Sequence, residues 1–296
     1  MYAFRVAKNA GLNFLNIVVS LVAGVGVSIV VTRYLGPERY GEYQTAVWLV
    51  ATGTMILGFG MSETARRYVA AMDGQGQQTA ALRLASTILK IQLGVTIVAV
   101  ALLVLGAQLV ADALRQPTLA RYVVLASIAL GPELLSSILQ SVLAGFQRFG
   151  SLTIVGILRS LVTLTVALMA AHLDMGIEGL LSALIALNLG IMSVLVFTVY
   201  RLRREHASSL HTQPSLDIRP LVTYSAMVFL TIMMDMVVRS QVFFLNRLSS
   251  SAEVGFYSLS SSLSYLAVAT IPNALSGVLM PALAERWGAS DQRWLG

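Results

Sequence analysis

Residues 33–43 read Arg-Tyr-Leu-Gly-Pro-Glu-Arg-Tyr-Gly-Glu-Tyr, and this stretch separates two apolar runs, 11–32 and 43–61. Each run has about the 20 apolar residues that a helix needs to cross a bilayer. Gly36 can end the first helix in a left-handed conformation, Pro37 suits the first position of the next helix, and Glu38 lies in that helix's first turn, where the helix dipole favours an acid. The stretch therefore predicts a tight hairpin between two membrane-spanning helices.

The composition indicates a membrane protein. Hydrophobic residues make up 56% of the 296 residues and charged residues only 11%, whereas a soluble chain carries roughly 25% charged residues. The net charge of +6 would suit nucleic acid, but the basic residues form short clusters between apolar runs, which is typical of the loops that orient membrane helices. We therefore expect no nucleic-acid partner. The absence of cysteine excludes disulfides and thiolate chemistry.

Eight apolar runs predict an all-α, polytopic membrane bundle with about eight spanning helices. Their approximate ranges are 11–32, 41–62, 84–110, 121–146, 152–173, 177–200, 220–246 and 254–282. Alternate loops carry twelve of the 20 Lys and Arg residues on one side and five on the other, with three left in or near spans. Because the basic side of a membrane protein faces the cytoplasm, we expect both termini there.

An internal repeat divides the chain. Gly41-Glu42-Tyr43, at the start of the second run, recurs as Gly255-Phe256-Tyr257 at the start of the eighth, 214 residues later. Six runs lie in one repeat, which is the parallel-repeat plan of two-lobed transporters. We expect a six-helix lobe over 1–204, a cytoplasmic linker over 205–219 and the first two helices of a second lobe over 220–296. On this plan the chain is a truncated or partial form of a longer one.

The stretch at the first hairpin also carries a family resemblance. Its key residues are Leu35, Gly36, Pro37, Glu38, Tyr40, Gly41 and Tyr43, supported by Lys8-Asn9-x-x-x-Asn13, Gly60-Met61-x-x-x-Ala65-x-Arg67, Ala144-Gly145-Phe146-Gln147-Arg148-Phe149 and Val254-Gly255-x-Tyr257. The pattern resembles the polysaccharide-biosynthesis (O-antigen) flippases of the multidrug/oligosaccharidyl-lipid/polysaccharide exporter superfamily.

This resemblance implies a transporter rather than an enzyme, with no cofactor. The implied cargo is an undecaprenyl-diphosphate-linked oligosaccharide, moved across the bacterial cytoplasmic membrane for O-antigen or exopolysaccharide synthesis. The implied mechanism is alternating access of two lobes around a cationic cavity. Membrane lipid and the polysaccharide polymerase or ligase machinery are the implied partners.

Ionisable residues within the spans are the first site candidates, because each costs about 2.5–3.5 kcal/mol at the centre of a membrane helix unless it has a partner or a wet cavity. Asp235 and Arg239 lie four residues apart, where they either neutralise each other or face a cavity. Arg159 either binds cargo phosphate or extends to the membrane surface. Glu133, after Gly131-Pro132, either couples transport to an ion or is the partner of Arg159. Asp235 is the second candidate for ion coupling.

The other site candidates are polar residues nearer the span ends or on the first helix. Lys90 is a phosphate candidate or an interfacial anchor, and Arg67 falls on the family motif at the end of the second span. Asn13, Asn16 and Ser20 share one side of the first helix, where they either bind sugars or bond to a neighbouring helix. We therefore predict cargo contacts from Arg159, Arg239, Lys90, Arg67, Asn13 and Asn16.

Three other functions are alternatives for this pattern: a drug antiporter, a polysaccharide ligase or polymerase, and an accessory protein. An antiporter of cationic drugs from the same superfamily would need an excess of acids in its spans, and the spans here hold at least as many bases. A membrane-embedded polysaccharide ligase or polymerase would need a long outer loop with catalytic residues. An accessory protein without transport activity is a further alternative. No metal-ligand or nucleotide-binding spacing occurs in the sequence.

Overall fold

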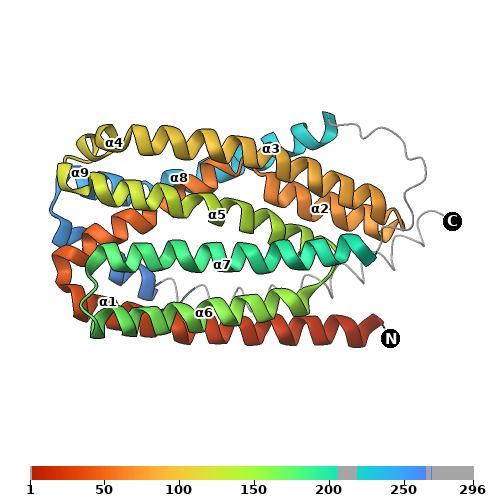
Figure 1. The fold of residues 1–296 in the computed structure, drawn as a ribbon, viewed down its shortest axis with the longest axis horizontal. Coiled ribbons are helices and arrows are strands. Elements are labelled where there is room, and N and C mark those ends of the chain that lie inside the picture. Colours follow the sequence, from red (N-terminus) through yellow and green to blue (C-terminus); the bar gives the residue numbers. More distant parts are fainter. Residues whose placement is uncertain (1, 206–218, 265–267, 269–296) are drawn as a thin grey trace.

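The computed structural model describes residues 2–205, 219–264 and 268, without the side chains of residues 2–10, 13, 235, 238 and 239. In this part of the chain all regular elements are helical, so the predicted all-α class is confirmed (Figure 1). The elements are α1 (Tyr2–Leu57), α2 (Met61–Gly74), α3 (Gln78–Leu105), α4 (Ala107–Ala113), η1 (Pro117–Leu119), α5 (Ala120–Gly145), α6 (Phe149–His172), α7 (Gly176–Glu205), α8 (Arg219–Arg239) and α9 (Gln241–Leu248). Residues 251–264 are also helical.

The chain reverses at Gly36, as the sequence predicts. Gly36 has φ 73° and ψ 171°, which is not a helical conformation. The label α1 therefore covers two helices that meet at a kink at Gly36. The first half of α1 runs parallel to α6, because Ser20 contacts Ser160 and Tyr34 contacts Asp174, both pairs 140 residues apart. The second half runs parallel to α5, the antiparallel neighbour of α6 (Figure 1). The bundle thus has a Gly36 end and, opposite it at the α5–α6 turn, an Arg148 end.

Within the described part of the chain, five helical segments are long and apolar enough to cross a membrane: Phe14–Leu57, Gln78–Leu105, Pro117–Gly145, Phe149–His172 and Gly176–Glu205. The first of them contains two predicted spans, since the chain turns back at Gly36. The span predicted over 220–246 is divided at Ser240 into α8 and α9. Most of the span predicted over 254–282 lies outside the described residues.

The second predicted span, 41–62, is interrupted near its end and then continues beyond residue 62 as a second helix, α2. Its helix ends at Leu57 and resumes as α2 at Met61, with Phe59 at φ 45° and Gly60 at φ 66° between them. The fully buried Gln92 side chain on α3 donates a hydrogen bond from Nε2 to the Leu57 carbonyl at 3.0 Å. A side chain from a neighbouring helix thus satisfies a carbonyl that the interruption leaves free, as apolar surroundings require.

Helix α8 packs directly against this interruption. The rings of Phe59 and Phe229 stack with centroids 4.4 Å apart, and the hydroxyls of Thr64 and Ser225 lie 2.7 Å apart. A Cβ on Gly60 would lie 2.7 Å from the carbonyl oxygen of Ser225. Glycine is therefore required at position 60 both for the left-handed backbone and for the close approach of α8.

The Gly60→Ala substitution is expected to destabilise the protein by about 1–2 kcal/mol from the left-handed backbone alone, with the clash against α8 adding to this. Thermal unfolding of the detergent-solubilised protein measures the effect. Gly24→Ala is the matched control, because a Cβ there meets no atom within 4 Å. Equal melting temperatures for the two variants would contradict the close contact between Gly60 and α8.

Candidate functional site

An ion pair between α5 and α6 lies near mid-depth in the bundle. Arg159 Nη1 donates to Glu133 Oε1 at 3.2 Å and Arg159 Nη2 to Glu133 Oε2 at 2.7 Å, so the contact is two-pronged. At 1.5 Å per residue, Glu133 lies about 20 Å from the start of α5 and about 18 Å from its end. The pairing of Glu133 with Arg159 that the sequence left open is therefore formed.

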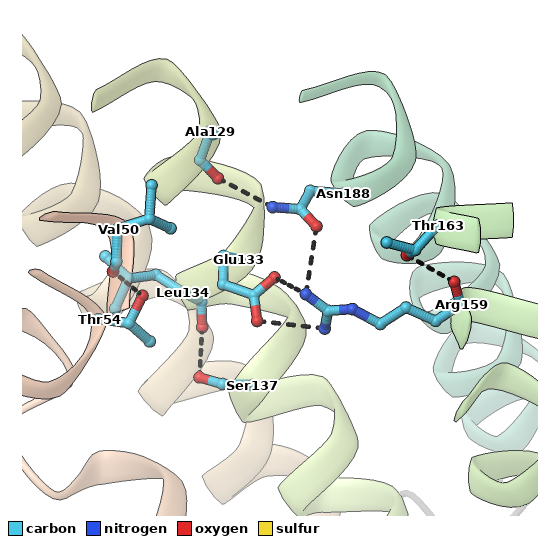
Figure 2. Close-up of polar contacts among 9 residues, drawn as sticks. All are labelled: Val50, Thr54, Ala129, Glu133, Leu134, Ser137, Arg159, Thr163 and Asn188. Atoms are coloured by element: carbon cyan, nitrogen blue, oxygen red, sulfur yellow. Dashed lines mark hydrogen bonds and ion pairs between the residues drawn. The ribbon is translucent and has the colours of Figure 1, made fainter. Parts of the chain in front are cut away.

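A third helix contributes Asn188 to this pair. Asn188 on α7 is buried; its Oδ1 lies 3.4 Å from Arg159 Nη2, and its Nδ2 donates to the Ala129 carbonyl on α5 at 3.3 Å. Figure 2 shows Arg159 extending from α6 toward both Glu133 and Asn188. The three polar side chains join α5, α6 and α7 in a single hydrogen-bonded network, called the Arg159 network below.

The Arg159 network faces the inside of the bundle. Ile154, Leu161 and Leu168 are 68%, 51% and 51% exposed and mark the lipid-facing side of α6. At 3.6 residues per turn, Arg159 points to nearly the opposite side of the helix. Its contact with Glu133 means that it does not extend to the membrane surface, which was the alternative for this residue. The side chains of Arg159 and Glu133 keep 33% and 21% exposure, so neither charge is fully enclosed.

Lys90 and Arg67 lie away from this network. Lys90 is exposed on α3 beside the exposed Ile91 and Leu93, and α5 and α7 separate α3 from α6 (Figure 1). Arg67 on α2 has its guanidinium 4.5 Å from the ring centroid of Tyr224 on α8. The described structure therefore does not bring these two cations together with Arg159, and their predicted cargo contacts stay predictions.

Two polar residues of the first helix, Asn16 and Ser20, contact α6. Asn16 packs against Gly156, where an added Cβ would lie 2.3 Å from Asn16 Oδ1, and this oxygen is buried without a hydrogen-bond partner. Ser20 bonds to Ser160 at 2.9 Å. The side chains of Asn13, Asp235 and Arg239 lie outside the described residues, so their predicted roles stay predictions.

Residues from the two predicted repeats meet at the Gly36 end. A Cβ on Gly41 would lie 1.8 Å from the Ser251 carbonyl oxygen, and a Cβ on Gly255 would lie 2.3 Å from the Pro37 carbonyl oxygen. The two repeat glycines thus allow the backbones of the second half of α1 and of residues 251–264 to touch. Small residues are the usual means of such close helix contact in membranes.

A polar cluster surrounds this glycine contact. The Thr45 hydroxyl donates to Asn246 Oδ1 at 3.1 Å, Gln116 Nε2 donates to the same oxygen at 3.2 Å, and the Ser251 hydroxyl donates to Gln116 Oε1 at 3.2 Å. Arg247 donates to the Ala113 carbonyl at 3.1 Å. These contacts therefore hold helices that precede the 205–219 linker in the chain to helices that follow it, at the Gly36 end.

A family model described as "Polysaccharide biosynthesis protein" matches residues 30–292. The chain belongs to this polysaccharide biosynthesis family. No curated protein and no solved structure shows significant similarity to it.

Two parts of this polysaccharide biosynthesis protein escaped prediction from sequence. Asn188 is the only Asn, Gln or charged residue between Gly179 and Tyr200, and that isolation in an apolar run was the available signal. Gln116 and Asn246 carried no such signal, because both lie near predicted span ends, where polar residues are common. Their contact depends on how distant segments pack.

Proposed function

We propose that this polysaccharide biosynthesis protein is a flippase that moves a polyprenyl-diphosphate-linked oligosaccharide across the bacterial cytoplasmic membrane. The observation that carries the proposal is Arg159, a mid-depth cation on the inner side of α6. Resident charges within membrane spans commonly mark the path of a charged substrate.

The physical problem for such a cargo is its diphosphate, which must cross ~30 Å of hydrocarbon. A guanidinium offers two parallel donors to phosphate oxygens, as it does to a carboxylate. In the cargo-free protein Glu133 holds these donors, so neither charge is left alone in apolar surroundings. On loading, the diphosphate replaces the Glu133 carboxylate on Arg159, and Asn188 continues to position the guanidinium.

The displaced Glu133 then needs a new partner, which makes it the ion-coupling candidate. A proton or a cation arriving with the cargo would neutralise its carboxylate while the diphosphate occupies Arg159. Arg239 and Asp235, on the other side of the 205–219 linker, are the second pair that the proposal assigns to the path. Lys90 and Arg67 are assigned to guiding the phosphate near the membrane surface, since neither adjoins Arg159.

Alternating access supplies the movement. We place the Arg148 end in the cytoplasm, because most of the basic residues that lie between spans belong to that side. The contact of Gly41 with residues 251–255 then closes the outer side, and cargo loads from the inner leaflet. Opening the outer side separates the two predicted lobes, 1–204 and 220–296, at this contact, while the polyprenyl tail stays in lipid.

A drug antiporter from a related family is the main competing function. A cationic drug would have to compete with Arg159 for Glu133, the acid that the described network already neutralises. A ligase or polymerase would form glycosidic bonds rather than move its lipid donor between leaflets.

Two assays of the full chain in liposomes separate these functions. One follows the leaflet position of a fluorescent polyprenyl-diphosphate oligosaccharide, and the other follows cation-gradient-driven uptake of a cationic dye. We expect movement of the oligosaccharide and no dye uptake. Dye uptake with a stationary oligosaccharide would identify an antiporter, and a lengthened saccharide in place of movement would identify a polymerase or ligase.

A further inference from the structure

A groove at the Arg148 end lies between the first turn of α6 and the last turns of α7. Its volume is about 400 Å³, and it is lined by Arg148, Ser151, Phe197, Thr198, Arg201 and Glu205, with Leu143 and Leu202 beneath. At 1.5 Å per residue, α6 is about 36 Å long, which exceeds the ~30 Å of a bilayer's hydrocarbon core. The start of α6 therefore reaches the level of the lipid headgroups.

The lining of the groove is amphipathic along the membrane normal. Phe197 is 64% exposed and lies two turns of α7 before Glu205, so it faces acyl chains. Arg148, Arg201 and Glu205 lie nearer the helix ends, and Ser151 is in the first turn of α6. An apolar side toward the bilayer and a charged side toward water match the two parts of one phospholipid.

The charge of the groove favours an anion. Two guanidinium groups face one carboxylate, and the start of α6 adds the positive end of a helix dipole. Arg148 Nη2 lies 3.2 Å from Glu205 Oε2, but these side chains are 50% and 49% exposed. An exposed pair of this kind contributes roughly 0–1 kcal/mol, so a phosphate can displace Glu205 from Arg148.

We propose that this groove binds the phosphate headgroup of an anionic phospholipid, with Arg148 and Arg201 on the phosphate and Phe197 beside the acyl chain. Basic pockets between membrane helices at this level favour such headgroups. The phosphodiester of phosphatidylglycerol carries one negative charge, which complements the net charge of the groove. This assignment requires only that the bundle spans a bilayer and is independent of the flippase proposal.

Native mass spectrometry of the full chain in detergent tests the proposal, with phosphatidylglycerol and phosphatidylcholine of the same acyl length as probes. The wild type is expected to retain phosphatidylglycerol preferentially. Arg148→Gln and Arg201→Gln should each lower that retention about fivefold, the equivalent of ~1 kcal/mol per charge. Glu205→Gln should raise it, because the substitution removes the carboxylate that competes for Arg148.

Lipid retention is expected to fall in the two arginine variants and to rise in Glu205→Gln. These opposite changes separate loss of binding from loss of fold, since a misfolded variant would not gain lipid. Arg33→Gln and Arg39→Gln, exposed arginines at the Gly36 end, are the matched controls and should change nothing. Equal retention of the two lipids by the wild type would overturn the proposal, as would a loss of phosphatidylglycerol in Glu205→Gln. Retention of polyprenyl diphosphate without phosphatidylglycerol would instead assign the groove to the cargo and contradict the phospholipid site.

Discussion

Cells that depend on the double variant Glu133→Gln/Arg159→Gln are expected to contain normal amounts of the protein and almost no surface polysaccharide. Two glutamine side chains can still hydrogen-bond between α5 and α6, and no charge is left unpaired in the bundle. The cargo diphosphate, however, loses its mid-depth cation. In the proposed loaded state, Arg159 and the cargo phosphate form a close charge pair. Removing one member of such a pair costs ~3 kcal/mol or more, so transport should fall on the order of 100-fold.

The single variant Arg159→Gln completes this test. Arg159→Gln should lower transport equally and should also destabilise the protein by about 1–3 kcal/mol, because Glu133 loses its partner; partial exposure of the pair places this below the cost in a sealed core. Surface polysaccharide is measured by gel electrophoresis and protein amount by immunoblot. Normal polysaccharide in the double variant would mean that the pair only joins α5 to α6.

Cross-linking the Gly36 end is expected to stop transport completely. Thr45 and Asn246 are both buried and hydrogen-bonded at 3.1 Å across the contact that the proposal opens in each cycle. Since the chain has no cysteine, a Thr45→Cys/Asn246→Cys variant offers only these two thiols to a short bifunctional thiosulfonate. Transport should fall to background after treatment and return when a reductant cleaves the bridge.

A second cysteine pair provides the control for this experiment. Ser20 and Ser160 lie 2.9 Å apart between α1 and α6, helices that belong to the same predicted lobe and do not separate in the proposed cycle. The same reagent should link Ser20→Cys to Ser160→Cys without slowing transport. Full activity in the linked Thr45→Cys/Asn246→Cys protein would show that the Gly36 end stays closed during transport.

The reversal at Gly36 and the positions of most helices could be predicted because they depend on local sequence. A left-handed glycine followed by proline fixes a turn wherever it lies, and apolar run length fixes a span. The Glu133–Arg159 contact was within reach for a related reason. Few charges occur in the spans, and each must find a partner.

The interruption at Gly58–Gly60 was missed because the apolar run continues through it. Glycine is common in membrane helices, so Gly58 and Gly60 do not by themselves distinguish a continuous helix from an interrupted one. The second feature of the interruption is on another helix, where the buried Gln92 donates to the Leu57 carbonyl. For a similar reason, the sequence could not show that Lys90 and Arg67 lie apart from Arg159. Residue position gives depth in a membrane, but the side of the bundle depends on the order in which helices pack.

Solid-state NMR can measure whether a phosphate reaches Arg159, using ³¹P–¹⁵N dipolar recoupling. The full chain carries ¹⁵N in its arginine side chains and is loaded with polyprenyl-diphosphate oligosaccharide in liposomes. The account predicts a guanidinium nitrogen within about 4 Å of a diphosphate phosphorus, which its chemical shift distinguishes from the phosphodiesters of the lipid. This diphosphate signal should disappear in Arg159→Gln. Bound cargo that gives the same signal in wild type and Arg159→Gln would contradict a diphosphate site at this arginine.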